Sequence, residues 1–166
     1  MTYDLHGTWD AIDPFIGAIM LAHTNLTEIR QSMDLMWRNK ISPAKVNMGI
    51  GFYGRSFTAS NPNCIQSGCQ FSSGGLPGQC TQSEGTLSYT EIEQIIATQH
   101  PTIIFDQQAA VKIVTWNTDQ WVSFDDAQSL ALKMDYANSE CIGGTMVWAV
   151  SLDIVSMAQN SRPLRR

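Results

Sequence analysis

MTYDLHGTWD, residues 1–10, places an acid, a histidine and a tryptophan in and around a glycine-containing loop. We expect Met1–Leu5 to form a short buried strand that runs directly into this loop. A Tyr-Asp pair at the end of a strand, followed by an aromatic side chain, is typical of a sugar site at the mouth of a barrel. The stretch therefore predicts an α/β fold with a polar site at a strand end.

Length and charge limit what this fold can be. At 166 residues, with 43% hydrophobic residues, the chain can bury one core. A complete (β/α)8 barrel needs roughly 250 residues. The net charge of −5 and the scattered Lys and Arg argue against a nucleic-acid partner. Arg162, Arg165 and Arg166 form a small basic tail that we interpret as a solvated end.

The apolar run Pro14–Ala22 is the segment most similar to a leader or a membrane span. Asp4, Asp10 and Asp13 precede it and no basic residue does, which is the wrong flank for a signal peptide. The run is also too short to cross a bilayer. We therefore expect no signal peptide in this chain and no membrane partner.

The chain has four cysteines, which allow three disulfide pairings. Their spacing lacks the tight pairs of zinc fingers, and no histidine is close to them in sequence. We favour disulfides over a structural metal or free thiols, and disulfides indicate a secreted protein. The candidate disulfide cysteines are Cys64, Cys69, Cys80 and Cys141.

Residues 26–39 have the pattern of an amphipathic helix. Asn25 can cap it, with Glu28 three positions later at the capping-box spacing. Asn25 also begins an Asn-Leu-Thr glycosylation sequon, but the local support favours the cap. The face expected to be buried comprises Leu26, Ile29, Met33, Met36 and Trp37.

Two further helices are predicted at 89–99 and 126–138. Ser88 and Glu91 form a capping box at the start of the first. The apolar spacing of the second predicts one buried face. That face comprises Ala127, Leu130, Ala131 and Met134.

Strand patterns fill the rest of the chain. Residues 45–53 alternate bulky and small side chains, and 53–57 are expected to leave the strand for a loop. With the N-terminal strand and the helix between them, 45–53 would complete a parallel βαβ unit. Residues 110–116 and 120–124 predict an antiparallel hairpin. Residues 145–150 are nearly all apolar, which is typical of a parallel strand covered on both faces.

Three motifs occur in a fixed order: MTYDLHGTWD at 1–10, KVNMGIGFYGRSF at 45–57 and GGTMVWAVSLD at 143–153. Together they resemble the sixth, seventh and eighth barrel strands of the chitinases of glycoside hydrolase family 18. The segment TNLTEI at 24–29 and the cysteine-bearing insertion are most similar to the fungal branch. The resemblance covers about residues 1–153.

This resemblance implies a partial TIM (β/α)8 barrel, containing the sixth to eighth strands, with an α+β chitinase insertion domain. Barrel segments would occupy 1–56 and 125–153, on either side of the insertion domain at 57–124. A diverged tail would occupy 154–166. Three strands cannot close a barrel, so open sheet edges would be available for self-association.

The resemblance also implies hydrolysis of β-1,4-N-acetylglucosamine linkages in chitin, with no cofactor. The family uses substrate assistance. A glutamic acid protonates the glycosidic oxygen, and the acetamido oxygen of the substrate attacks the anomeric carbon with net retention.

Matching the motifs position by position implies a set of substrate-binding residues. Tyr3 would bond the acetamido oxygen, and Asp4 would contact the distorted sugar beside it. Trp148 would stack under the central sugar, and Trp9 would line the leaving-group side. The remaining members are Tyr53 and Arg55 near the cleft wall and Met1 as a buried residue lining the site.

Three residues have structural interpretations instead. His6, alone in its loop, is expected to be a hydrogen-bonded structural residue. Trp116 and Trp121 are expected in the core of the insertion rather than at a sugar platform.

The family's catalytic acid belongs to the motif Asp-Gly-x-Asp-x-Asp-Trp-Glu, which does not occur among the 166 residues. The resemblance therefore supplies no catalytic residue. The chain is expected to be the C-terminal part of an extracellular chitinase. The alternatives are a non-catalytic chitin or chito-oligosaccharide-binding protein, or an inactive remnant.

Overall fold

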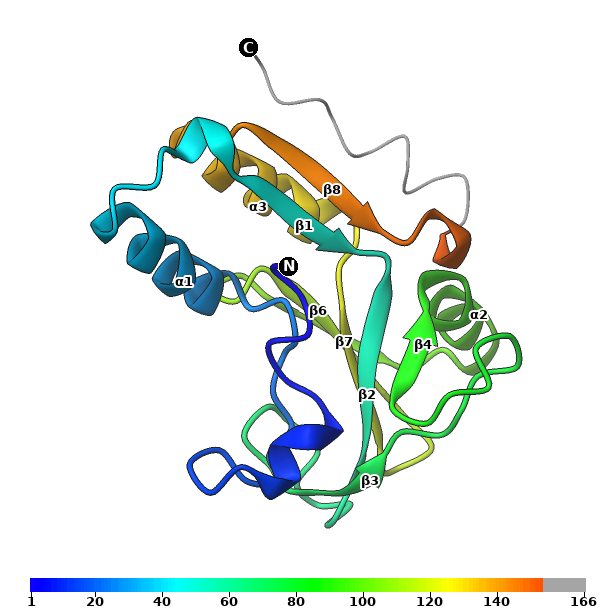
Figure 1. Ribbon diagram of the computed structural model, residues 1–166. Helices are drawn as coiled ribbons and strands as arrows, with labels where there is room; N and C mark the ends of the chain where they lie inside the picture. The colour runs from blue at the N-terminus through cyan, green and yellow to red at the C-terminus, as the bar shows by residue number, and fades with distance from the viewer. Residues whose placement is uncertain (154–166) are drawn as a thin grey trace.

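The computed structural model describes residues 1–153 (Figure 1). This part of the chain forms helices, two β-sheets and short 3-10 turns. The tail at 154–166, expected to diverge from the family, lies outside the described residues. None of the helices in residues 1–153 has the length and apolar character needed to span a bilayer.

The helices lie where the sequence predicts them. Asn25 Oδ1 accepts the Thr27 amide at 2.9 Å, so Asn25 acts as a cap. Ser88 and Glu91 form the expected capping box. The α-helices are α1 (Leu26–Arg38), α2 (Tyr89–Gln99) and α3 (Ala127–Ser139), and the 3-10 helices are η1 (Thr8–Ile12), η2 (Pro43–Lys45) and η3 (Val150–Leu152).

The predicted helix faces are only partly correct. In α1, the Met36 side chain is 38% exposed, although Leu26, Ile29 and Met33 are buried as expected. In α3, Ala127 and Ala131 are exposed, because the buried face follows a neighbouring stripe that includes polar side chains. That stripe comprises Ser129, Leu130, Lys133, Met134, Tyr136 and Ala137.

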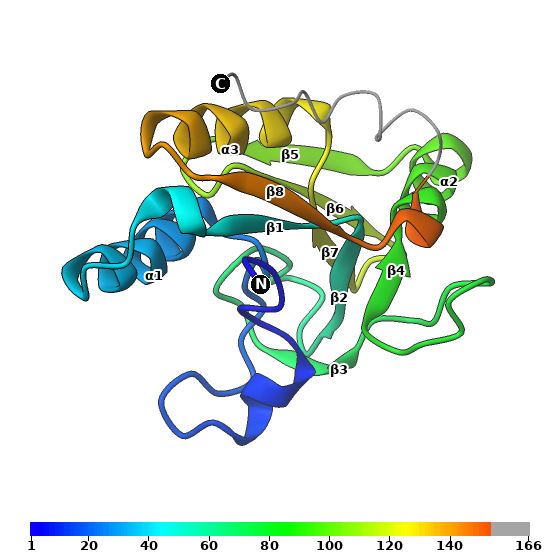
Figure 2. The same cartoon turned by 45° about the horizontal axis from the view of Figure 1, so that its top comes forward.

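The strands form two sheets, which meet where the chain passes from one sheet to the other. β1 pairs in parallel with β8, while the antiparallel sheet has the order β3-β2-β7-β6-β5, with β4 also on β2. Only Phe52 separates β1 from β2, so the chain passes directly from one sheet to the other (Figures 1 and 2). The strands are β1 (Asn47–Gly51), β2 (Tyr53–Ala59), β3 (Phe71–Gly74), β4 (Thr86–Ser88), β5 (Thr102–Asp106), β6 (Val111–Trp116), β7 (Gln120–Phe124) and β8 (Gly144–Trp148).

The β6–β7 hairpin is confirmed, with Trp116 opposite Gln120. The loop predicted at 53–57 is wrong, because this segment is most of β2. Arg55 pairs with Ser123 on one side and with Thr86 on the other. Partners on both edges stabilise a strand whose own residues do not alternate clearly.

The strand predicted at Met1–Leu5 is also wrong. Thr2 Oγ1 donates to the Gly49 carbonyl, and the Leu5 amide donates to the His23 carbonyl at 3.1 Å. These isolated bonds make no ladder, and Asp4 at φ 58° interrupts an extended path. The predicted βαβ unit is therefore not formed within residues 1–153. The parallel pair is β1 with β8.

β8 is less covered than its apolar sequence predicts. Trp148 is 58% exposed and Met146 is 38% exposed. β1 pairs with one edge of β8, and within the described chain no strand pairs with the other edge. The open edge of β8 leaves a row of backbone N–H and C=O groups without a strand partner in the described chain.

Two hydrophobic clusters stabilise the fold. The larger packs α1, α3 and β1 against the antiparallel sheet, with Met48, Ile50 and Leu130 nearly inaccessible. The smaller surrounds Phe57, which stacks on Phe71, and includes the fully buried Trp121. Trp116, in the larger cluster, and Trp121, in the smaller one, are both buried core residues, as predicted.

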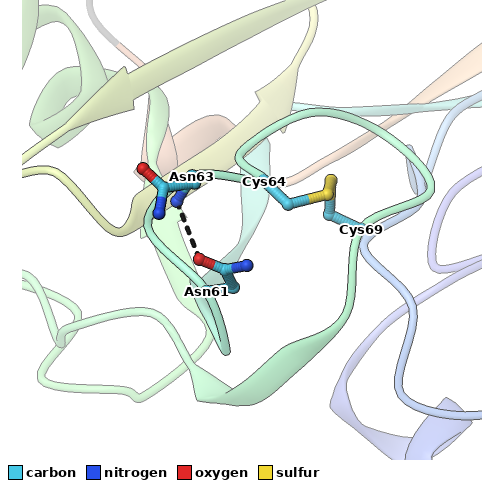
Figure 3. The surroundings of a disulfide bond; sticks show 4 residues. All are labelled: Asn61, Asn63, Cys64 and Cys69. Carbon is cyan, nitrogen blue, oxygen red and sulfur yellow. Dashed lines mark hydrogen bonds between the residues drawn. A yellow bond between two sulfur atoms is a disulfide. The ribbon is translucent and has the colours of Figure 1, made fainter.

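The cysteine prediction is confirmed for one pair. Cys64 and Cys69 form a disulfide that closes a short loop beside Asn61 and Asn63 (Figure 3). Cys80 and Cys141 are free and exposed, so the wider disulfide prediction is wrong for them. A five-residue separation lets the first two meet locally. No group of metal-ligating side chains occurs among residues 1–153.

A buried ion pair lies at the start of α3. Lys133 Nζ donates to Asp125 Oδ2 at 2.7 Å, and Ser129 Oγ donates to Asp125 Oδ1 at 2.7 Å. The Lys133 and Asp125 side chains are 3% and 2% exposed. Removing one member of such a pair leaves an uncompensated buried charge.

We expect Lys133→Ala to lower the free energy of unfolding by about 3–5 kcal/mol, because the Asp125 carboxylate would lose its partner. Urea denaturation measures this change. Lys45→Ala, at an exposed position, should change it by less than about 0.5 kcal/mol. Equal effects of the two substitutions would contradict a stabilising pair.

Candidate functional site

The glycine face of β1 allows the N-terminal segment to lie against the strand. A Cβ atom at Gly49 would be 2.9 Å from Tyr3 Cε1 and 3.3 Å from the Thr2 amide nitrogen. A Cβ atom at Gly51 would be 3.5 Å from Tyr3 Cβ and 3.1 Å from Tyr53 Cε1. The small residues of this strand therefore bring Tyr3 beside Tyr53, with ring centroids 6.0 Å apart.

Asp4 connects the N-terminal segment to β2. The Tyr53 hydroxyl donates to Asp4 Oδ1 at 2.6 Å, and Arg55 Nε donates to the same oxygen at 2.8 Å. No hydrogen bond to Asp4 Oδ2 occurs within residues 1–153, and the side chain is 31% exposed. One carboxylate oxygen is thus fixed by the protein while the other can accept a hydrogen bond from a ligand.

The surroundings hold Asp4 ionised. Burial alone would raise the pKa of this carboxyl, but the hydrogen bonds from Arg55 and Tyr53 and the charge of Arg55 outweigh it and bring the pKa well below its usual range. Burial and the bond to Asp4 raise the pKa of Tyr53, so its hydroxyl stays a donor. Asp4 is therefore a charged hydrogen-bond acceptor, held in place by the Tyr53 hydroxyl and Arg55 Nε.

His23 supports the arrangement of Asp4 and Tyr53 as a neutral ring. Its Nδ1 accepts the Asp4 amide at 3.3 Å, and its Nε2 lies 3.2 Å from the Tyr53 carbonyl oxygen. The neutral tautomer with a proton on Nε2 satisfies both contacts. Burial lowers the pKa of His23, which agrees with this assignment. His23 lies in an irregular segment and carries no sequence motif that could have identified it.

Arg55 links Asp4 to Trp9. Its guanidinium carbon lies 4.8 Å from the centre of the Trp9 ring, and Nη1 donates to Thr86 Oγ1 at 2.6 Å. The Trp9 ring also lies close to Gly7, where a Cβ atom would be 2.3 Å from the ring. Trp9 stays 42% exposed. It is therefore oriented by its neighbours and still open to a ligand.

Trp148 lies at the end of β8, opposite Gly51 in the parallel register. Its carbonyl accepts the Phe52 amide at 2.9 Å, and its peptide bond to Ala149 is cis. Because Gly51 contacts both Tyr3 and Tyr53, the exposed indole and the Asp4 cluster belong to one end of the β1–β8 pair.

Most of the predicted residues are thus brought together, with one exception. Contacts join Tyr3, Asp4, Trp9, Tyr53 and Arg55, and Trp148 adjoins them through β1. The prediction of Met1 as a buried residue is wrong. It is 86% exposed, because only its backbone lies against Gly49.

His6 has the structural role that the sequence predicts. Its Nδ1 lies 2.8 Å from Asp10 Oδ2, and its Nε2 lies 3.0 Å from Glu28 Oε2. With a carboxylate at each ring nitrogen, the imidazolium form donates both bonds. Burial lowers the pKa of His6, but the bonds to Glu28 and Asp10 raise it overall. This His6 clamp fastens the loop that carries Trp9 to the start of α1.

An ionised acid held by Tyr and Arg, near two exposed tryptophans, combines groups that suit a polar ligand with apolar faces. The family model of the glycosyl hydrolases family 18 matches residues 1–153. The chain therefore belongs to this family, as the three sequence motifs indicate.

Curated relatives are chitinases. The secreted chitinase LysM12 of Penicillium expansum is 29% identical over 92% of this chain and 11% of its own length. Probable chitinase 10 of Drosophila melanogaster is 32% identical over 92% of this chain and 7% of its own length. The chain thus spans a small part of these proteins.

Solved structures with a similar fold include a chitinase and a pseudo-chitinase. The GH18 chitinase of Cycas revoluta in complex with (GlcNAc)3 is 26% identical, with a TM-score of 0.82, over 97% of this chain and 44% of that chain. Human YKL-39, a pseudo-chitinase with retained chitooligosaccharide binding properties, is 25% identical, with a TM-score of 0.82, over 99% and 46%.

The His6 clamp predicts a pH-dependent stability. Because its folded pKa is raised, its contribution should be fully present below the unfolded pKa of ~6.5 and lost as pH rises through the folded value. The difference in unfolding free energy between wild type and His6→Gln, measured in urea from pH 6 to 9, should shrink with pH. For Gln99→Ala, at an exposed position of α2 without a titratable side chain, the difference should not vary. A constant difference for His6→Gln would contradict the clamp.

Proposed function

We propose that this chain forms the substrate-holding part of a family 18 chitinase active site. The observation that carries the proposal is the free Oδ2 of an Asp4 whose Oδ1 is already bonded by Tyr53 and Arg55. Such a carboxylate is preorganised to accept a hydrogen bond from an N-acetylglucosamine unit. Tyr3, on the same side of β1, would bond the acetamido oxygen.

The aromatic side chains would position the sugar rings. Trp148, 58% exposed, offers its face to the apolar side of the central sugar. Trp9, held under Arg55, would contact the sugar on the leaving-group side. Tyr53 and Arg55 would act through Asp4, and Met1 would line the outer edge of the site.

The same proposal assigns the sheets to a partial (β/α)8 barrel. The N-terminal segment, β1 and β8 would correspond to its sixth, seventh and eighth strands, in segments 1–56 and 125–153. Residues 57–124 would be the α+β insertion domain. The parallel β1–β8 pair and the separate antiparallel sheet support this division. The unpaired edge of β8 would be open to another strand, including one from a second copy.

In the parent reaction the acetamido oxygen of the substrate attacks the anomeric carbon while a glutamic acid protonates the leaving oxygen. Tyr3 and Asp4 would hold the acetamido group in line for this attack. The acid motif is absent from the 166 residues, and a general acid contributes roughly 10²–10⁴-fold to the rate. The chain by itself is therefore proposed to bind chito-oligosaccharides without hydrolysing them.

A second candidate function is non-catalytic chitin binding by the mature protein. The likeness to YKL-39, a pseudo-chitinase that retains chitooligosaccharide binding, favours it. Both functions use the same binding residues and differ only in whether an acid is supplied. An extracellular location fits both, and the Cys64–Cys69 disulfide and the secreted relative support it.

Isothermal titration with chitotetraose tests the site. We expect Trp148→Ala to weaken binding by about 3- to 10-fold through loss of ring stacking. The nearby Val150→Ala, at a residue 73% exposed, should leave the affinity unchanged. A Trp148→Ala variant that binds as tightly as wild type would contradict a sugar platform here.

Asp4→Asn tests the hydrogen-bonding role. Asparagine tolerates the left-handed backbone at this position, so the fold should be retained. Loss of the charge should weaken chitotetraose binding by about 10-fold, since bonds to charged acceptors are roughly twice as strong as neutral ones. Asp34→Asn, on an exposed surface pair, is the matched control. Sugar release from chitotetraose by the wild-type chain would show that the chain hydrolyses it unaided.

A further inference from the structure

One buried residue joins the N-terminal segment to the antiparallel sheet through several hydrogen bonds. His23 is fully buried. Its ring nitrogen Nδ1 accepts the Asp4 amide at 3.3 Å, and its backbone carbonyl accepts the next amide, that of Leu5, at 3.1 Å. Its own amide donates to Ser123 Oγ on β7 at 3.4 Å. His23 thus holds two successive amides of the segment that carries Asp4.

The bond to the ring fixes an uncommon backbone conformation. Asp4 has a φ of 58°, in the left-handed region that few non-glycine residues occupy. An amide that is turned into the protein needs an acceptor, because leaving it without one costs free energy. The backbone of Asp4 also decides which carboxylate oxygen meets Tyr53 and Arg55. The acceptor on His23 therefore acts on the free oxygen of Asp4 through the backbone.

Only the neutral ring can accept this bond. Nε2 lies 3.2 Å from the Tyr53 carbonyl oxygen, so the single proton of the neutral ring belongs on Nε2 and leaves Nδ1 as the acceptor. A second proton, on Nδ1, would face the Asp4 N–H, which is also a donor. It would be drawn instead to Asp4 Oδ1, 3.7 Å away. Protonation would therefore release the Asp4 amide and compete with Tyr53 and Arg55 for Oδ1.

The groups around the ring set the pH at which this happens. The titratable groups that act on it are Asp4 in the N-terminal segment, Tyr53 on β2, Asp125 after β7 and Lys133 on α3. Burial lowers the pKa of His23 and outweighs the two carboxylates, which raise it, while Lys133 adds to the lowering. The ring is therefore neutral near pH 7 and is protonated only below its ordinary value of about 6.5.

We propose that His23 is a positioning residue for sugar binding, whose neutral ring keeps Asp4 in the ligand-binding orientation and whose protonation releases it. This inference rests on the proposed function and adds the residue that limits binding in acid. The pKa of Asp4 lies well below its usual range, so the carboxylate stays ionised while the ring is protonated. Loss of binding in mild acid would thus come from the ring.

Titration of the 166-residue chain with chitotetraose, from about pH 4.5 to about pH 7.5, tests this. We expect the wild-type affinity to be constant near pH 7. It should fall by up to about 10-fold per pH unit once the ring is protonated, because protonation and ligand binding then exclude one another. Circular dichroism at each pH checks that the chain remains folded.

Two variants of similar size distinguish the two ring nitrogens. In His23→Asn the amide oxygen can lie at the position of Nδ1 and accept the Asp4 amide, whereas in His23→Gln the amide group lies at the position of Nε2. Neither side chain titrates. His23→Asn should bind within about 3-fold of wild type at pH 7 and keep that affinity in acid. His23→Gln should bind about 10-fold more weakly at every pH.

His100→Asn, at the exposed end of α2, controls for protonation of another histidine and should reproduce the wild-type profile. If wild type and His23→Asn lose affinity equally in acid, or if His23→Asn and His23→Gln bind alike at pH 7, the ring is not the positioning group. The proposed function then stands as long as Trp148→Ala weakens binding. If the wild-type chain binds chitotetraose at no pH, the proposed function fails, and the inference fails with it.

The wild-type profile decides the matter if both His23 variants fail to fold. A fall in affinity that coincides with the titration of the His23 ring, followed by NMR, would support the inference. An affinity that stays constant while the His23 ring is protonated and the chain is folded would overturn it.

Discussion

The carboxylate of Asp4 is the interaction on which the rest of the site depends. It receives the Tyr53 hydroxyl and Arg55 Nε on one oxygen, and so joins residues 1–5 to a strand about fifty positions later. This segment forms no ladder with β1, so side chains rather than backbone pairing fix its position. Because Arg55 also lies over Trp9, the acid, the cation and the aromatic ring are set together. A change at one of them is therefore expected to shift the other two.

Two histidines support this network in opposite protonation states. His23 is fully buried and accepts an amide, which is possible only for a neutral ring. His6 has a carboxylate at each nitrogen, which suits the imidazolium. The first supports Asp4 without adding charge, while the second fastens the adjoining loop through charge. Near neutral pH, Asp4 thus stays ionised, and the sensitivity to pH lies in the supporting His6.

Periodicity and capping predicted the three helices and the β6–β7 hairpin, because those signals are local. The strand errors have another origin. Residues 53–57 extend because β7 and β4 pair with them, and residues 1–5 do not because Asp4 turns out of the extended path. Neither partner choice is encoded near the segment. The motifs identified Tyr3, Asp4, Trp9, Tyr53, Arg55 and Trp148 as neighbours, but His23 lies outside every motif and only the fold reveals its contact with Asp4.

If the proposed function holds, the arrangement of this site separates holding a sugar from cleaving it. The proposed holding groups are bonded to one another within the described chain, and none of those bonds involves a general acid. Such a site can keep its geometry whether or not an acid is supplied, because its preorganisation comes from Asp4, Arg55 and the glycine face of β1. A family 18 protein could thus lose hydrolysis and retain oligosaccharide binding, as the pseudo-chitinase YKL-39 illustrates. In this chain, binding and catalysis are therefore properties to be measured separately.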